Sequence, residues 1–350
     1  MANEDRSHLR REIREQPEVL RRMLEKQREN VERVAEIVRE RQPDYVVMAA
    51  RGSSDNAARY GQYLFGAAND LPIALATPSL FSLYNESPRL KNALVLGVSQ
   101  SGETPDIVSV LESGRRQGAL TVAVTNFADS PLGKAAEHVI CLDAGEEISI
   151  AATKTYTTSL MALAMLSAAL AQDRERFEVL ATVPDLVAEI TSSAPEIIAA
   201  AERYRYMEAC VVISRGYNYA TAYEIALKLK ELTYVLAEPY SSADFQHGPV
   251  AIVEQGFPVF SVVPEGQIAA ELIDLLKELQ DRKAELVVVS ALEEALALAQ
   301  TPLPLPKDIP EWVSPLVTVV PGQIFALGLT LAKGYDPDHP RELKKVTRTH

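Results

Sequence analysis

Short apolar runs alternate with amphipathic segments along the chain from residue 44 onward. The runs are rich in Val, Ile, Leu and Ala, and the segments between them carry apolar residues at helical spacing. Strands that are apolar throughout are typical of a parallel sheet with helices on both faces. We therefore predict an α/β fold. The strands expected in its first half cover residues 45–48, 74–76, 93–96, 120–124 and 138–142.

A similar order recurs in the second half, where the predicted strands cover residues 210–213, 259–263, 286–289 and 316–319. The two halves also begin alike, because residues 46–52 read VVMAARG and residues 211–216 read VVISRG. An Ala-rich helical segment follows each of these stretches. This self-similarity predicts an internal duplication. We expect helices over residues 159–204 to join the two copies, and the Pro-rich residues 301–310 to form a loop.

The N-terminal segment differs from this pattern. Residues 8–41 are rich in Glu, Arg, Leu and Val at helical spacing, and Pro17 can occupy the first turn of a helix. We predict two helices here, ahead of the first strand.

A hydroxyl-rich turn follows the third predicted strand. Residues 97–105 read GVSQSGETP and lead into a helical pattern, which places Ser99, Gln100, Ser101 and Thr104 at a helix N-terminus. Unpaired N–H groups and hydroxyls at such a position suit a phosphate group. The turn lacks the lysine of a Walker loop, so a phosphosugar is favoured over a nucleotide. An ordinary polar helix cap remains the alternative for this segment alone.

A second turn strengthens this interpretation. Ser53 and Ser54 follow the first strand, and ligands of open α/β sheets bind beyond the carboxyl ends of the strands. Both turns can therefore contact one phosphate. The matching place in the second half, residues 263–267, reads VPEGQ and lacks the hydroxyls. We expect one copy alone to bind phosphate.

The densest group of ionisable side chains lies in residues 224–231, which read EIALKLKE. On a helix, Glu224, Lys228 and Glu231 share one face, and such a face is most often a solvated stripe of ion pairs. The polar segment 238–249 follows and carries a single histidine, His247. A carboxylate and an imidazole together are suited to moving protons on a sugar.

Composition excludes several classes of function. A formal net charge of −13 argues against binding nucleic acid over a broad face. The five histidines do not cluster, and Cys141 and Cys210 lie in Val- and Ile-rich runs, so we expect no metal site, no cofactor and two buried thiols in a reducing cytoplasm. No stretch suggests a signal peptide or a membrane span. The expected protein is soluble and cytoplasmic.

Six stretches carry a specific resemblance. The chain resembles the sugar isomerase (SIS) family, and most closely the isomerase half of glucosamine-6-phosphate synthase, in order along nearly its whole length. The matching stretches are ARGSSDNA from Ala50, SQSGET from Ser99, ATK from Ala152, ALKLKE from Ala226, HGP from His247 and PRELKKVT from Pro340. The likeness implies two tandem SIS domains, each a flavodoxin-like three-layer αβα unit. We expect N-terminal helices over 1–43, SIS domains over 44–190 and 191–338, and an active-site tail over 339–350.

The resemblance also implies roles for individual residues. Ser53, Ser54, Ser99, Gln100, Ser101 and Thr104 match phosphate-binding positions. Glu231 matches the base that moves a proton between C1 and C2, and Lys345 matches a tail lysine that can form a Schiff base with the open-chain ketose. His247 matches the ring-opening residue, which the family supplies from the neighbouring subunit of a dimer. Lys228 and Glu224 match supporting positions, and Ile150 and Ala152 match residues whose backbone lines the sugar.

The chain begins Met1-Ala2-Asn3, without the N-terminal cysteine of the synthase, so we expect no use of glutamine as nitrogen donor. The resemblance then favours a glucosamine-6-phosphate deaminase, which forms fructose 6-phosphate and ammonia. A deglycase or isomerase acting on another 6-phosphosugar, such as a fructosamine 6-phosphate, is the close alternative. A non-catalytic sugar-phosphate sensor is the third, although retention of Glu231, His247 and Lys345 weighs against it. We expect no nucleic-acid or membrane partner.

Overall fold

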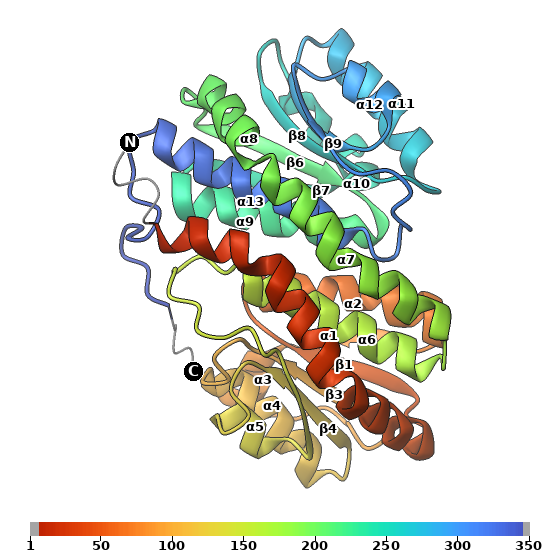
Figure 1. Cartoon of the computed structure of the whole chain (residues 1–350). Helices are drawn as coiled ribbons and strands as arrows, with labels where there is room; N and C mark the ends of the chain where they lie inside the picture. Colours follow the sequence, from red (N-terminus) through yellow and green to blue (C-terminus); the bar gives the residue numbers. More distant parts are fainter. Residues whose placement is uncertain (1–6, 346–350) are drawn as a thin grey trace. The chain divides into compact units, whose positions relative to one another are not determined.

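The computed structural model describes residues 7–345. The chain forms two compact units, each with its own parallel five-stranded sheet (Figure 1). The first-sheet unit contains residues 15–147, 152–184 and 344–345. The second-sheet unit contains residues 7–14, 148–151 and 185–343. Residues 346–350 of the predicted tail lie outside the described residues.

The first-sheet unit has strands in the order β2-β1-β3-β4-β5, and every neighbouring pair is parallel. Side chains of β1, β3 and β4 pack against α4 and α5 on one face, where Val95, Ile107 and Leu111 share a core. Helices α2 and α6 pack together and cover the other face. The elements are β1 (Tyr45–Ala49), α2 (Ser53–Asn69), β2 (Ile73–Leu75), α3 (Pro78–Ser82), β3 (Ala93–Val98), α4 (Pro105–Arg116), β4 (Leu120–Thr125), α5 (Pro131–Ala135), β5 (His138–Cys141) and α6 (Lys154–Leu170).

The second-sheet unit repeats this plan with the order β10-β9-β8-β6-β7. Helix α11 packs its apolar side on one face of the sheet, and α9 and α13 lie together on the other, where Phe325 of α13 contacts Phe260 of β8. The elements are α8 (Ala194–Ala201), β6 (Ala209–Ser214), α9 (Tyr219–Thr233), β7 (Leu236–Ser241), α10 (Ser242–Gln246), β8 (Pro258–Val263), α11 (Ala269–Asp281), β9 (Glu285–Ser290), α12 (Glu293–Ala297), β10 (Thr301–Pro304) and α13 (Pro315–Ala332).

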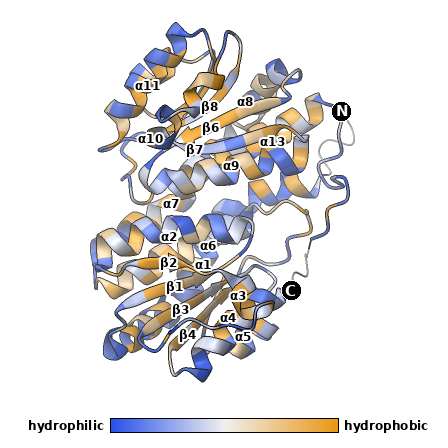
Figure 2. Ribbon diagram, turned by 180° about the vertical axis from the view of Figure 1, so that it is seen from behind, coloured by the Kyte–Doolittle hydropathy of each residue, from blue (hydrophilic) through white to orange (hydrophobic). Residues whose placement is uncertain are grey.

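The predicted α/β fold with two similar three-layer units is confirmed. Counted from the first strand of each unit, both sheets have the order 2-1-3-4-5, which is the flavodoxin-like order. Strands β6 and β8 are apolar along most of their length, whereas α11 carries a hydrophilic side (Figure 2). Apolar strands beneath amphipathic helices are the pattern that the sequence predicted.

One predicted strand is wrong, because residues 316–319 belong to helix α13. Their β-branched side chains favour a strand locally, but the helix is buried on all sides and so lacks the amphipathic periodicity that would have identified it. Among residues 7–345, α13 alone is long and apolar enough to cross a membrane, contrary to the expectation of no such stretch. This helix is 89% buried inside the protein, as a core helix is.

Two edge strands were not predicted. Strand β7 contains Pro239, and β10 contains Pro302 and Pro304 within the expected loop over 301–310. Proline cannot donate a ladder hydrogen bond, but it is tolerated in an edge strand. The prolines therefore obscured two strands that lie at the edges of the second sheet.

Two further expectations need correction. The N-terminal segment is one helix, α1 (His8–Arg41), with Pro17 inside it. Loss of one backbone hydrogen bond is tolerated there because buried apolar side chains lie on both sides of Pro17, among them Ile13 and Leu20.

Cys141 is only partly buried, whereas Cys210 is fully buried, and burial raises the pKa of Cys210 to about 12. Helices α6, α7 (Arg174–Ser192) and α8 fill the expected helical stretch.

Candidate active site

The predicted phosphate turn connects β3 to α4 in the first-sheet unit. The Ser99 hydroxyl accepts a hydrogen bond from the Gly102 N–H at 3.1 Å, and the Ser101 hydroxyl accepts one from the Glu103 N–H at 3.3 Å. Thr104 is the N-cap of α4, and its hydroxyl makes no capping hydrogen bond. A hydroxyl that accepts a bond can still donate its own proton. The turn therefore presents hydroxyl donors at a helix N-terminus.

Gly102 is required for this turn. Its φ is 64°, and a Cβ atom at this position would lie 2.1 Å from Oγ of Ser130. Any other residue would be strained in this backbone conformation, and its Cβ atom would clash with Ser130. The Ser130 side chain, at the N-cap of α5, thus constrains the shape of the turn.

The second serine pair lies at the same edge of the first sheet. Ser53 and Ser54 begin α2, which follows β1 after the three residues 50–52, and Gly52 has a φ of 55°. Strands β1 and β3 are neighbours in the sheet, so the turns that follow them lie side by side. The structure thus brings all six predicted phosphate-binding residues, Ser53, Ser54, Ser99, Gln100, Ser101 and Thr104, to one edge of one sheet.

The matching turn of the second-sheet unit is occupied by the protein itself. The Gln267 N–H donates to Oε2 of Glu311 at 2.8 Å, and a Cβ atom on Gly266 would lie 2.2 Å from that oxygen. A carboxylate of the same chain therefore uses the anion-binding capacity of this turn. That one copy alone binds phosphate stays a prediction.

The three predicted ionisable residues of 224–231 lie together on α9. The Lys228 ammonium is 2.6 Å from Oε2 of Glu231 and 3.4 Å from Oε1 of Glu224. Lys228 and Glu224 have side chains only 1% and 0% exposed, whereas the Glu231 side chain is 24% exposed. A solvated stripe of ion pairs is thereby excluded. The cluster instead holds one reachable carboxylate beside a buried cation.

His247 lies at the end of α10 in the same unit and is exposed. Its backbone N–H donates to the Asp244 carbonyl oxygen, which fixes the turn but leaves the imidazole at the surface. Ile150 is half-buried in the second-sheet unit. The segment before it is held by Glu12, a fully buried carboxylate that accepts hydrogen bonds from the N–H groups of Ile148 and Ser149.

A second buried carboxylate organises the segment around Ala152. Glu147 accepts hydrogen bonds from the N–H groups of Thr153 and Thr155 at 2.9 and 3.1 Å, and from the Thr155 hydroxyl at 2.6 Å. The Lys345 ammonium lies 2.6 Å from Oε2 of the same carboxylate. The predicted imine-forming lysine is therefore seated, by an ion pair, against the start of α6 in the first-sheet unit.

Lys154, which the sequence analysis left outside the catalytic set, is 3% exposed and pairs with Glu15 at 2.6 Å. Within residues 7–345, no group of three His, Cys, Asp or Glu side chains is arranged to hold a metal ion.

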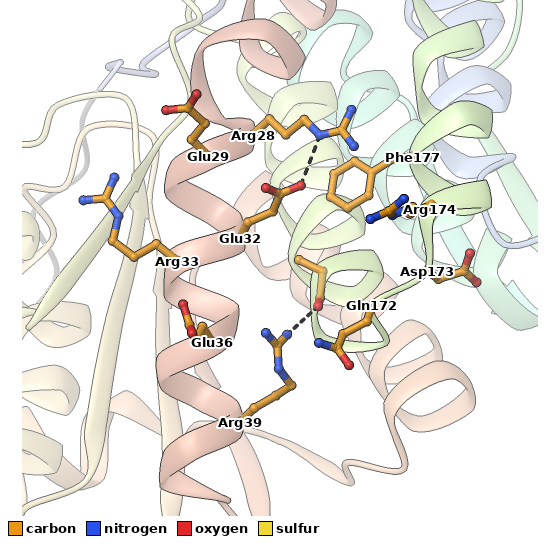
Figure 3. A pocket seen from close by; sticks show the side chains of 11 residues that line it. Arg28, Glu29, Glu32, Arg33, Glu36, Arg39, Gln172, Asp173, Arg174 and Phe177 are labelled. Carbon is orange, nitrogen blue, oxygen red and sulfur yellow. Dashed lines mark hydrogen bonds and ion pairs between the residues drawn. The ribbon is translucent and has the colours of Figure 1, made fainter.

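A separate, charged pocket lies on the first-sheet unit, where α1 faces the segment from Ala169 to Phe177 (Figure 3). The Arg28 guanidinium stacks 4.6 Å above the Phe177 ring and pairs with Glu32. Arg39 donates to the Ala169 carbonyl oxygen at 2.6 Å. The described residues that line this pocket include none of the predicted site residues. The pocket is therefore not the candidate active site.

A family model describes this arrangement. The SIS domain model matches residues 41–169 and again residues 208–329. The chain belongs to the SIS domain family. The two matches follow the two sheets, so the predicted tandem SIS organisation is confirmed.

Three relatives of this SIS chain are informative. It is 34% identical over 345 residues to the glutamine–fructose-6-phosphate aminotransferase (isomerizing) of Thermococcus kodakarensis, covering 96% of this chain and 57% of that protein. It thus spans about half the length of the curated relatives it matches. A Silicibacter pomeroyi DSS-3 structure, provisionally described as a phosphosugar isomerase, is 36% identical with a TM-score of 0.85, covering 95% of this chain and 100% of that one.

The third relative is the glucosamine-6-phosphate deaminase structure from Thermotoga maritima. It is 22% identical with a TM-score of 0.76, and the match covers 98% of this chain and 100% of that one. A likeness at this identity shows the shared fold alone.

Sequence reasoning about this SIS chain missed Glu147. Glu147 follows Glu146 in a segment without a periodic pattern, and its importance comes from its burial, which the sequence alone does not show. The one available clue was its position five residues before Ala152, at the start of the stretch that includes Ile150.

The Glu147 contact predicts a pH dependence. Burial alone would raise the pKa of this carboxyl group, but the Lys345 ammonium and the donors of Thr155 and Thr153 outweigh it and hold the pKa below the ordinary 4.5. A carboxyl group whose pKa is lowered in the folded state stabilises the fold at pH values above its ordinary pKa. This stabilisation disappears as the pH falls through the pKa of the folded state. Wild type should therefore exceed Glu147→Gln in free energy of unfolding at pH 7, and this difference should shrink below about pH 4.5. Urea unfolding from pH 7 to pH 3.5 measures it. A constant difference would contradict the assignment.

Proposed function

We propose that this chain is a glucosamine-6-phosphate deaminase, an enzyme that converts glucosamine 6-phosphate and water to fructose 6-phosphate and ammonia. The α9 cluster is the observation that carries this proposal, because binding a phosphosugar needs no buried lysine beside a partly exposed carboxylate. The hydroxyl turn of the first-sheet unit supports the phosphate as ligand. Similarity to aminotransferases that isomerize fructose 6-phosphate supports an amino sugar as substrate.

The chemistry begins with ring opening and proton transfer. Ring opening moves a proton from the C1 hydroxyl to the ring oxygen and exposes the C1 aldehyde. Glu231 then removes the C2 proton, which is acidified by the aldehyde, and an enolamine forms. Return of a proton to C1 gives a ketimine at C2. A carboxylate placed for such a transfer contributes about 10²–10⁴-fold to the rate.

Ammonia leaves at the next step. The neutral amine of Lys345 adds to C2 of the ketimine, ammonia departs, and water then releases fructose 6-phosphate and the free lysine. Lys345 must lose a proton before it can attack, because a protonated amine is not a nucleophile. In the structure its nitrogen lies 2.6 Å from Oε2 of Glu147.

We further propose that His247 opens the ring from the neighbouring subunit of a homodimer. Its exposed position at the end of α10 supports this role. If so, a mixture of Glu231→Gln and His247→Asn chains should recover activity, because a mixed dimer contains one site with both native residues. No recovery after subunit exchange, checked by mass spectrometry of the mixed dimers, would contradict a shared site.

A deglycase or isomerase acting on another 6-phosphosugar would use the same residues. Glu231 and the hydroxyl turn serve any aldose–ketose isomerisation of a sugar 6-phosphate, and the substrates differ in the groups at C1 and C2. A sugar-phosphate sensor would bind the same ligands without converting them.

One panel of substrates separates these functions. The purified chain is incubated with glucosamine 6-phosphate, fructosamine 6-phosphate and glucose 6-phosphate, without glutamine or metal, and ammonia and ketose phosphate are followed. We expect ammonia from glucosamine 6-phosphate alone. Turnover of another sugar would favour the deglycase or isomerase, and binding without turnover would favour the sensor. The Glu231→Gln variant controls for contaminating activity.

A further inference from the structure

An arginine lies beside the phosphate turn. Arg51 lies two residues after the end of β1, and its Nε and Nη2 atoms lie 2.9 and 2.7 Å from Oδ2 of Asp106. Asp106 belongs to the first turn of α4, two residues after Thr104. This contact places the guanidinium at the N-terminus of α4, next to the hydroxyls that are proposed to bind phosphate.

The exposure of the two partners differs sharply. Asp106 is 1% exposed, whereas the Arg51 side chain is 49% exposed. A guanidinium has five N–H donors, and contact with a single carboxylate oxygen uses two of them. The arginine is therefore oriented by a buried anion while a large part of its donor group faces solvent.

The second-sheet unit contains a matching pair, which serves as an internal reference. Arg215 follows β6 directly and pairs with Glu271 in the first turn of α11. There both carboxylate oxygens are engaged, one by Arg215 and the other by the Ser242 hydroxyl. In the first-sheet unit, Oδ1 of Asp106 is buried without a hydrogen-bond partner among the described residues. The Asp106 carboxylate beside the hydroxyl turn therefore has fewer hydrogen bonds than the Glu271 carboxylate in the second-sheet unit.

Electrostatics favour a ligand-binding role for this arginine. The turn itself contains hydroxyls and no lysine or arginine, and the chain has a net charge of −13. A buried carboxylate in the first turn of α4 would repel a phosphate dianion unless a cation offset it. Arginine supplies that cation together with planar donors that match phosphate oxygens.

We propose that Arg51 is a further substrate-binding residue, whose guanidinium contacts the phosphate group of the substrate while Asp106 orients it. The proposal rests on the proposed function only for the identity of the substrate, because Arg51 would bind the phosphate group of any phosphate monoester in the same way. Arg51 would supply the single fixed cation of a turn otherwise built from hydroxyls.

The variants Arg51→Gln and Arg215→Gln provide a matched test. A charge-assisted hydrogen bond contributes about 1.5–3 kcal/mol, so Arg51→Gln should raise KM for glucosamine 6-phosphate by about 10- to 100-fold with kcat nearly unchanged. Arg215→Gln removes the same kind of ion pair from the copy without hydroxyls and should leave KM unchanged. Equal effects of the two variants on KM would overturn the proposal.

Calorimetric titration with inorganic phosphate makes the test independent of turnover. Arg51→Gln should weaken phosphate binding by the same factor as it raises KM, even if the chain proves to have a different phosphosugar as substrate. Unchanged phosphate affinity would overturn the role of Arg51 and leave the deaminase proposal standing.

A double variant separates direct contact from simple charge compensation. If Arg51 only neutralises Asp106, then Arg51→Gln combined with Asp106→Asn should restore phosphate affinity. We expect only partial recovery, because Asp106→Asn removes the repulsion of the phosphate but does not restore the contact that Arg51 makes; full recovery would overturn the proposed contact. Thermal unfolding of each variant identifies any loss of fold, and Arg51→Lys, which keeps the charge without the planar fork, should retain part of the affinity.

Discussion

Replacing Glu231 with glutamine is expected to lower kcat for glucosamine 6-phosphate by about 10²–10⁴-fold, because the amide cannot accept the C2 proton. The change keeps the shape of the side chain and leaves the phosphate turn intact. Phosphate affinity should therefore stay within about threefold of wild type, which separates loss of chemistry from loss of binding. Steady-state kinetics and titration with inorganic phosphate measure the two quantities.

Glu238→Gln is the matched control for this prediction. Glu238 is exposed on β7, seven residues further along the chain, and its replacement removes the same charge from the same unit. It should leave kcat unchanged. A Glu231→Gln variant with kcat close to wild type would show that another group moves the proton.

Replacing Lys228 with methionine is expected to lower the free energy of unfolding by about 3–5 kcal/mol. The ammonium is buried between Glu224 and Glu231, so its removal leaves a fully buried carboxylate without its cation. The cost comes from the uncompensated charge more than from the lost contact. Urea unfolding at pH 7 measures it.

Lys230→Met on the same helix provides the comparison. Lys230 is exposed, and surface substitutions of this kind change the free energy of unfolding by no more than about 0.5 kcal/mol. A loss for Lys228→Met no larger than that for Lys230→Met would mean that the buried cluster contributes little to the fold.

The sequence predicted the secondary structure correctly where the burial of an element in the fold matches the pattern of apolar residues along it. Fully buried central strands such as β3 and β4 form continuous apolar runs, and the turn after β3 is rich in hydroxyl side chains. Both were predicted correctly. The edge strands β7 and β10 were missed because prolines at permitted edge positions resemble loop residues. Helix α13 was mistaken for a strand because complete burial removes amphipathic periodicity.

The candidate site shows a similar division. Helical spacing predicted that Glu224, Lys228 and Glu231 share one face of α9, but spacing alone could not distinguish a solvated stripe from a buried cluster. Tertiary packing decides that question. Glu147 and Arg51 were not predicted as functional, because the role of each depends on a partner far away in the sequence, Lys345 and Asp106 respectively.

The most direct test of deamination is a ¹H NMR time course of the purified chain with glucosamine 6-phosphate in D₂O. The deaminase reaction predicts fructose 6-phosphate and ammonia in equimolar amounts, with solvent deuterium at C1 of the product wherever the C2 proton exchanges before it is returned. Glucosamine 6-phosphate that stays unchanged and unexchanged, with a preparation that still binds inorganic phosphate, would contradict the proposed function.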